Sequence, residues 1–353
     1  MRIVSAELTA YRLPFATPWI SAAGHLTERR GWLVRVRDRS GRCGHGDAAP
    51  LPAAGTETAP ESRAWLEERL PRMTGLSPDA ACRALPPASG HPAARCGLET
   101  ALLDLQARQQ GVPLYRLLGG EAGHAVRLNA ALGALNESSG ERAAAAIAAG
   151  FNILKLKLGS APMTVELPLL EQLCERLPAG VQLRLDANRA WRADETRQLI
   201  ERLNQLPIES LEEPLRDPQR EILNELQALA RFDLALDESL PGYLQAGQRL
   251  PPLPVKRLVI KPACLGGLLP ALELIRQARQ QGTACVITST LESSAGLWPL
   301  CHLAAAADAL TTPAVHGLAT SAWFTRDLGG APVIRDGRVT LGPESGTGFI
   351  LRA

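Results

Sequence analysis

Charged side chains end five short, strand-like stretches in the middle of the chain. In chain order these residues are Lys157, Asp186, Glu212, Asp237 and Lys261, spaced 24 to 29 residues apart. A single acid at a strand end is more often a helix cap or half of an ion pair. Five charged ends in a near-regular series require one common explanation.

Three carboxylates flanked by two lysines are the groups that a metal-assisted proton transfer needs. Oxygen-only ligation favours a hard divalent cation, Mg²⁺ first and Mn²⁺ second. A lysine beside such a cation and partly removed from water has a lowered pKa, so it can act as a general base. These residue types predict that a substrate carboxylate binds the metal, that one lysine removes the α-proton, and that the cation stabilises the enediolate.

The elements around these residues alternate between strand-like and helix-like patterns. Residues 121–319 contain about seven βα units, the pattern of a (β/α)8-type barrel. Functional residues of such barrels lie at the C-terminal strand ends, so the five charged residues would converge there. The pattern predicts a first strand over 125–132, a short helix near 243–249 and a weak eighth strand within 311–318.

The first 120 residues follow a different pattern. Alternating stretches near 3–8 and 31–37 predict antiparallel strands, and 57–70 and 93–118 predict helices. The tail, residues 320–353, predicts a hairpin around an Asp-Gly turn that returns to this first region. We therefore expect a modified (β/α)7β barrel over 121–319, capped by an α+β domain that 1–120 and the tail form together.

Composition excludes several classes of function. The net charge is only +2, from 38 basic and 36 acidic residues, which gives no support to nucleic-acid or membrane-surface binding. Seven scattered cysteines, never spaced as C-x-x-C, are typical of reduced thiols. No apolar stretch reaches the roughly 18 residues of a membrane span, and the N-terminus lacks a signal-peptide core. We expect a cytoplasmic protein that acts on a small-molecule carboxylate, with no obligate protein partner evident.

Taken together, the motifs resemble those of the enolase superfamily, in its muconate-lactonizing branch. The motifs are Lys155-Leu156-Lys157, Asp186, Glu212-Glu213-Pro214, Asp237-Glu238-Ser239 and Val259-Ile260-Lys261-Pro262. The similarity is greatest to the o-succinylbenzoate synthases of the proteobacterial menaquinone pathway, through segments 184–191 and 258–297. It extends to the first domain, where 44–52 resembles a family motif, although Asp47 stands where Glu is common and 315–318 matches poorly.

This resemblance implies a role for each charged residue. Asp186, Glu212 and Asp237 would ligate Mg²⁺. Lys157 would abstract the α-proton and return it to the departing hydroxide, which gives a syn dehydration. Lys261, on the opposite face, would stabilise the planar enediolate. Supporting or substrate-binding roles are implied for Lys155, Arg184, Asn188, Thr288 and Ser289, and residues 15–30 would cover the succinyl tail of the substrate.

Besides the synthase, we consider a different reaction at the same site and a barrel without catalytic activity. An N-succinylamino acid racemase or a dipeptide epimerase would use the same lysines and metal for 1,1-proton transfer. Dipeptide epimerases tend to carry Asp-x-Asp where this chain reads Thr288-Ser289-Thr290, which disfavours that activity. A barrel that binds without catalysing is the third possibility, but a binding module has no need of both lysines and all three carboxylates.

Overall fold

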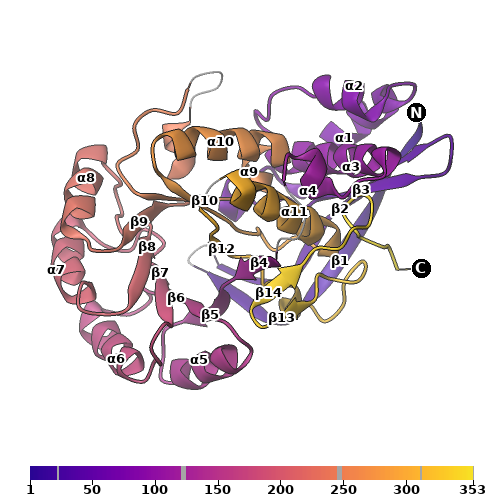
Figure 1. Cartoon of the computed structure of the whole chain (residues 1–353). Coiled ribbons are helices and arrows are strands. Elements are labelled where there is room, and N and C mark those ends of the chain that lie inside the picture. Colours follow the sequence, from indigo (N-terminus) through magenta and orange to yellow (C-terminus); the bar gives the residue numbers. More distant parts are fainter. Residues whose placement is uncertain (22–23, 121–124, 245–248, 311, 353) are drawn as a thin grey trace.

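The computed structural model describes residues 1–21, 24–120, 125–244, 249–310 and 312–352, and it describes no side chains within 19–25. Figure 1 shows a curved parallel sheet with helices around its outside, next to an antiparallel sheet that has helices of its own. The expected combination of barrel and α+β part is therefore confirmed. No helix in the described ranges has the length and apolarity needed to span a lipid bilayer.

Seven parallel strands form the curved sheet, and their order in space follows their order in the chain. They are β5 (Ala130–Ala134), β6 (Ile153–Lys157), β7 (Gln182–Asp186), β8 (Ile208–Glu212), β9 (Asp233–Leu236), β10 (Arg257–Ile260) and β11 (Ala284–Ile287). The helices that follow them are α5 (Ser139–Ala148), α6 (Met163–Glu175), α7 (Ala193–Leu203), α8 (Arg220–Leu229), the one-turn α9 (Pro262–Leu265), α10 (Leu268–Gln280) and α11 (Ser294–Leu310).

Strand alternation separates the core from the barrel interior. Leu154 and Leu156 are fully buried in the main hydrophobic core, and Lys155 and Lys157 alternate with them. Successive side chains of a strand point to opposite faces, so the leucines pack under the helices and the lysines face inward. The strand pairing is in register at the ends: Lys157 pairs with Asp186, and Asp186 with Glu212. The fold therefore brings the charged strand ends to one level.

The predicted first strand over 125–132 is wrong in one respect, because it is two strands in different sheets. β4 (Ala125–Leu128) lies in a four-stranded sheet ordered β12-β4-β14-β13, whereas β5 begins the parallel sheet. The chain changes sheets at Asn129, whose backbone N–H donates to His316 O at 2.9 Å. The weak eighth strand is β12 (Val315–His316), and Gly317 beyond it forms a bridge with Thr288 after β11.

The tail hairpin pairs with a strand beside the barrel rather than with the first sheet. β13 (Ile334–Arg335) and β14 (Arg338–Thr340) flank the expected turn, and β14 pairs with β4. Both turn residues, Asp336 and Gly337, have positive φ (49° and 66°), as a two-residue hairpin turn requires. The chain on either side of the hairpin returns to the first region: Thr325 N donates to Pro14 O at 3.0 Å, and Gly346 O accepts from Leu114 N at 2.8 Å.

The first region is a three-stranded antiparallel sheet backed by helices. The strands are β1 (Ile3–Ser21), β2 (Gly24–Asp38) and β3 (Cys43–Ala48). The helices are η1 (Pro52–Ala54), α1 (Ala59–Met73), α2 (Pro78–Arg83), α3 (Pro92–Gln110) and α4 (Leu114–Leu117). The helix predicted over 93–118 is thus two helices, because Gly111 ends α3 in a left-handed conformation (φ 69°).

Glycines allow α3 to lie directly against β3. A Cβ at Gly46 would come within 1.9 Å of Gly97 O, so neither the strand nor the helix could keep its position. In the barrel, the expected helix near 243–249 is represented by η2 (Leu240–Tyr243), and residues 245–248 lie outside the described part. A further turn, η3 (Ser321–Trp323), follows β12.

Candidate active site

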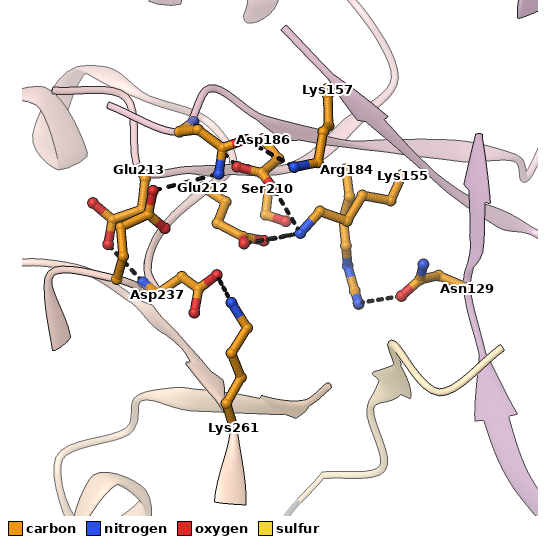
Figure 2. A network of polar contacts seen from close by, with 12 residues as sticks. Asn129, Lys155, Lys157, Arg184, Asp186, Ser210, Glu212, Glu213, Asp237 and Lys261 are labelled. Carbon is orange, nitrogen blue, oxygen red and sulfur yellow. Dashed lines mark hydrogen bonds and ion pairs between the residues drawn. The ribbon is translucent and has the colours of Figure 1, made fainter. Parts of the chain in front are cut away.

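A cavity of about 300 Å³ opens at the C-terminal ends of the parallel strands. Ligand sites are commonly cavities of this size or larger. Its lining includes four of the five charged strand-end residues, namely Lys157, Asp186, Asp237 and Lys261, together with Lys155. Glu212 lies just below and lines a smaller cavity of about 10 Å³ inside the barrel. The structure therefore gathers all the expected charged residues at one place (Figure 2).

Lys155 connects two of the three carboxylates. Its Nζ lies 2.8 Å from both oxygens of Glu212 and 2.9 Å from Oδ2 of Asp186. All three side chains are largely buried. Lys155 is therefore bound to the expected metal ligands and is not only a neighbour of Lys157.

The other two lysines lie on opposite sides of the carboxylates, as Figure 2 shows. Lys261, at the end of β10, contacts Asp237. Lys157, at the end of β6, donates to Asn188 Oδ1 at 3.1 Å. Asn188 has a left-handed backbone (φ 43°) and its N–H donates to Asp186 Oδ1 at 3.2 Å. A planar group held between these lysines would meet an ammonium on each face.

Burial and mutual repulsion dominate the electrostatics of the carboxylates. Burial raises the pKa of Glu212 well above its usual range, and the charge of Asp186 raises it further. The pKa of Asp186 is instead lowered, because the charges of Lys155 and Lys157 outweigh the effect of burial. Burial lowers the pKa of Lys155, but the neighbouring carboxylates outweigh it and the net shift is upward. The two lysines thus favour the ionised form of Asp186, whereas the burial of Glu212 and its closeness to Asp186 disfavour a second negative charge there.

The three carboxylates, those of Asp186, Glu212 and Asp237, are suited to bind a divalent cation, although in this structure they form ion pairs with Lys155 and Lys261. In the described part of the chain, no three carboxylate, imidazole or thiol groups are close enough together to ligate one ion. Lys155 and Lys261 contact the three acids in this structure. Buried, mutually repelling carboxylate oxygens are nevertheless the donor set that Mg²⁺ prefers. Asp186, Glu212 and Asp237 are the residues that could hold it, in place of those lysine contacts.

Glu213 links two neighbouring strand ends, a role that the motif alone did not indicate. Its carboxylate accepts from the backbone N–H groups of Asp237 (2.7 Å) and Ser239 (2.8 Å), and from Ser239 Oγ (2.7 Å). Burial raises the pKa of Glu213 to about 7, against the opposing hydrogen bond from Ser239. Glu213 also has a positive φ of 45°, an unfavourable conformation that its surroundings must maintain. It therefore fixes the backbone that presents Asp237.

Arg184 lies below the site rather than in the substrate cavity. Its guanidinium pairs with Glu209 (2.5 and 3.0 Å) and donates to Asn129 Oδ1 at 3.2 Å. It lines only the smaller cavity, with Asn129 and Glu212. Its described contacts are those of a supporting residue in the barrel interior.

Thr288 and Ser289 do reach the main cavity. Thr288 lines both cavities, and within the described residues its buried Oγ1 has no hydrogen-bond partner. Ser289 Oγ lies 2.9 Å from Thr320 Oγ1, which comes from the chain after β12. Both hydroxyls are thus placed where a bound molecule could meet them.

Part of the cavity wall was not anticipated from the sequence. Its members are small or apolar residues in loops and in η1, which have no distinctive spacing; they include Leu51, Ala53, Ala54, Thr290, Leu291 and Thr320. The segment 15–30, expected to cover the substrate tail, includes residues 22 and 23 and side chains that lie outside the described part. None of its described side chains lines the cavity.

Comparison with known proteins agrees with this architecture. Residues 139–353 match the family model described as "Enolase C-terminal domain-like", and residues 3–105 match "MenC, N-terminal domain". An o-succinylbenzoate synthase of Desulfotalea psychrophila is 29% identical, over 90% of this chain and 93% of its own. An N-succinylamino acid racemase of Thermus thermophilus is 30% identical, over 100% and 95%.

A solved structure extends the agreement to three dimensions. The dipeptide epimerase of Methylococcus capsulatus, complexed with Mg and the dipeptide L-Arg-D-Lys, superposes with a TM-score of 0.87 at 26% identity. The match covers 99% of this chain and 100% of the epimerase. With a family model over more than half of its length and relatives over nearly all of it, the chain belongs to the enolase superfamily.

Proposed function

We propose that the protein is an o-succinylbenzoate synthase, which dehydrates 2-succinyl-6-hydroxy-2,4-cyclohexadiene-1-carboxylate to 2-succinylbenzoate in menaquinone biosynthesis. The observation that carries the proposal is the placement of Lys157 and Lys261 on opposite sides of three buried carboxylates at the mouth of a cavity. Bound Mg²⁺, or Mn²⁺ in its place, would neutralise the carboxylates and polarise the substrate carboxylate.

The proposed mechanism uses one lysine as both base and acid. Lys157 Nζ takes the proton from the carbon α to the substrate carboxylate, and the C–H electron pair becomes a double bond to the carboxylate carbon, which gives the enediolate. Lys261 presents a positive charge to the other face of the planar enediolate, at a position that its contact with Asp237 supports. The C–O bond to the ring hydroxyl then breaks, Lys157 returns the proton to the departing oxygen, and water leaves an aromatic ring.

The cavity wall favours an acylated substrate over a dipeptide. Its carboxylates, within the described residues, are Asp186, Asp237 and Glu238, all at the strand ends beside the lysines. The rest of the wall presents lysines, amides, hydroxyls, one thiol and apolar side chains, so a free ammonium group away from the strand ends would have no carboxylate partner there. Charged groups require such a partner when they leave water.

A second candidate activity is the racemisation of N-succinylamino acids. Lysines on opposite faces can remove a proton from one face and return one to the other, which is the requirement for 1,1-proton transfer. The Thermus thermophilus relative, named as such a racemase, is as similar to this chain as the synthase relative is.

The decisive experiment is a spectrophotometric dehydration assay with Mg²⁺ and with chelator. We expect turnover that depends on the metal, and a loss of roughly 10²–10⁴-fold in kcat for Lys157→Ala because the general base is removed. Lys256→Ala is the matched control, since Lys256 is an exposed lysine that lines neither cavity.

Proton exchange in D₂O separates the two activities. Lys261→Ala should block incorporation of deuterium from one face of an N-succinylamino acid, whereas Lys157→Ala should block it from the other. Folded, Mg²⁺-loaded protein that dehydrates nothing, yet exchanges these α-protons, would replace the synthase by the racemase.

A further inference from the structure

Arg29 is a buried cation that binds the backbone of two distant segments. It lies on β2, and only 3% of its surface is exposed. Its guanidinium donates to Pro50 O (2.9 Å) and Ala49 O (2.7 Å) after β3. It also donates to Leu291 O (3.0 Å) and Thr290 O (3.2 Å) after β11. One side chain thus joins the first sheet to a loop of the barrel.

Both segments continue into the walls of the substrate cavity. The chain after Pro50 supplies Leu51, Ala53 and Ala54 to the cavity lining, and the barrel loop supplies Thr290 and Leu291 themselves. The guanidinium therefore holds together two adjoining parts of the wall that are some 240 residues apart in the chain.

The loop that Arg29 holds has an unfavourable backbone conformation. Leu291 has φ 63°, a left-handed geometry that is unfavourable for a non-glycine residue and persists only where the surroundings impose it. The carbonyl of this residue accepts the bond from Arg29 Nε. Arg29 is thus one of the contacts that keep Leu291 in the cavity wall.

Apolar packing and further hydrogen bonds connect the same two regions around Arg29. Leu291 packs into an apolar cluster with residues of β1, β2, α11 and the tail, among them Phe15 and Phe324. Beside the cluster, Asp47 accepts from Tyr11 Oη (2.6 Å) and from the N–H and Oγ of Ser293 (both 2.7 Å). Arg29, Asp47 and Leu291 are all buried, and hydrogen bonds from a buried cation to four acceptors are stronger than the same bonds at the surface.

We propose that Arg29 is a positioning residue that fixes how these two adjoining segments meet in the cavity wall, and thereby the fit of the part of the substrate remote from the reacting carbon. The proposal rests on the proposed function, since it concerns the same cavity. Arg29 lines neither cavity, so it acts through Leu51 and Leu291 and not by contact with the substrate.

The first test separates binding from chemistry. Arg29→Lys keeps the charge, but its three donors cannot serve four carbonyls on two segments. We expect KM to rise roughly ten- to hundredfold, because small misplacements at an enzyme site are costly. The change in kcat should stay below about threefold, because the lysines and carboxylates are held by other elements. Arg30→Met is the matched control: Arg30 is the next residue, exposed, and pairs with Glu28.

A second pair of measurements distinguishes positioning from general destabilisation. Affinity for 2-succinylbenzoate, measured by titration calorimetry, should fall in parallel with the rise in KM. For Arg29→Ala, guanidinium chloride at a non-denaturing concentration should recover part of the lost kcat/KM, whereas sodium chloride should not. An unchanged KM in Arg29→Lys with a lowered Tm would overturn the proposal and leave Arg29 a purely structural residue.

Failure of the proposed function would be recognised separately, in the wild-type protein. If wild type does not dehydrate the cyclohexadiene, the same KM comparison is made with N-succinylamino acid exchange. Hydrogen–deuterium exchange needs no substrate at all: the peptide containing Thr290 and Leu291 should exchange faster in Arg29→Lys than in wild type or Arg30→Met. Equal protection in all three proteins would refute the positioning role whatever the activity is.

Discussion

Replacing Lys155 by methionine tests whether cations keep the three carboxylates together. Lys155 has three contacts of 2.8 to 2.9 Å with Glu212 and Asp186, and the carboxylates are about 95% buried. Methionine keeps most of the apolar stem but removes the ammonium. The two acids then repel each other in a poorly solvated place, with Lys261 bound to Asp237 on the far side.

The cost can be worked out from the burial of these contacts. Removing one partner of a buried ion pair typically destabilises a protein by about 3–5 kcal/mol. For a chain of this size, roughly 2 °C in Tm corresponds to 1 kcal/mol, so metal-free Lys155→Met should melt roughly 6–10 °C below wild type. A divalent cation supplies the missing positive charge, so the variant should gain more from Mg²⁺ than wild type does.

Thermal melts in EDTA and at increasing Mg²⁺ give both quantities in one experiment. The expected result is a large deficit in Tm that narrows as Mg²⁺ rises, while Lys256→Met follows wild type throughout. The reasoning would be refuted by a metal-free deficit of only a degree or two. It would equally be refuted if Mg²⁺ raised the Tm of the variant no more than that of wild type.

Two further predictions concern packing and pH. Gly46→Ala should lower the free energy of unfolding in urea by at least about 1–3 kcal/mol, because its Cβ would overlap Gly97 O. Gly140→Ala, where the nearest atom to the added Cβ is 3.9 Å away, should be neutral or stabilising. Equal changes in stability in the two variants would contradict the packing argument. Burial lowers the pKa of His302 to about 4, so the unfolded state takes up its proton first. Stability should fall by up to about 3 kcal/mol between pH 6.5 and 4, and less steeply in His302→Asn; parallel pH curves would exclude this histidine as a cause.

The parts of the site that the sequence predicts are those carried by regular strands. Alternation places Lys155 and Lys157 on one face, and parallel pairing in register puts Lys157, Asp186 and Glu212 at one level. Both facts follow from local pattern and strand geometry, without knowledge of loops. The barrel, its order and the first three-stranded sheet were predictable for the same reason.

The parts that could not be predicted depend on contacts between distant segments. Nothing local indicates that the chain changes sheets at Asn129, or that β14 pairs with β4, because both depend on which strand edge is exposed in the folded protein. Arg29 is similar: beside Arg30 in a strand, it has the pattern of a solvated pair, and only the folded joint buries one of the two. Glu213 was within a recognised motif, but its bonds to the next strand end require the three-dimensional register.

The bonds of Arg29 to main-chain oxygens alone have a consequence for how the cavity can change over generations. Because the guanidinium holds the carbonyls of Thr290 and Leu291 and not their side chains, a mutation of either side chain leaves the hydrogen bonds in place. The side chains that face the substrate can therefore be replaced one at a time while the backbone that carries them keeps its position. In this chain, substitutions of the side chains at 290 and 291 would change the surface that meets the substrate while the hydrogen bonds of Arg29 to the backbone remain.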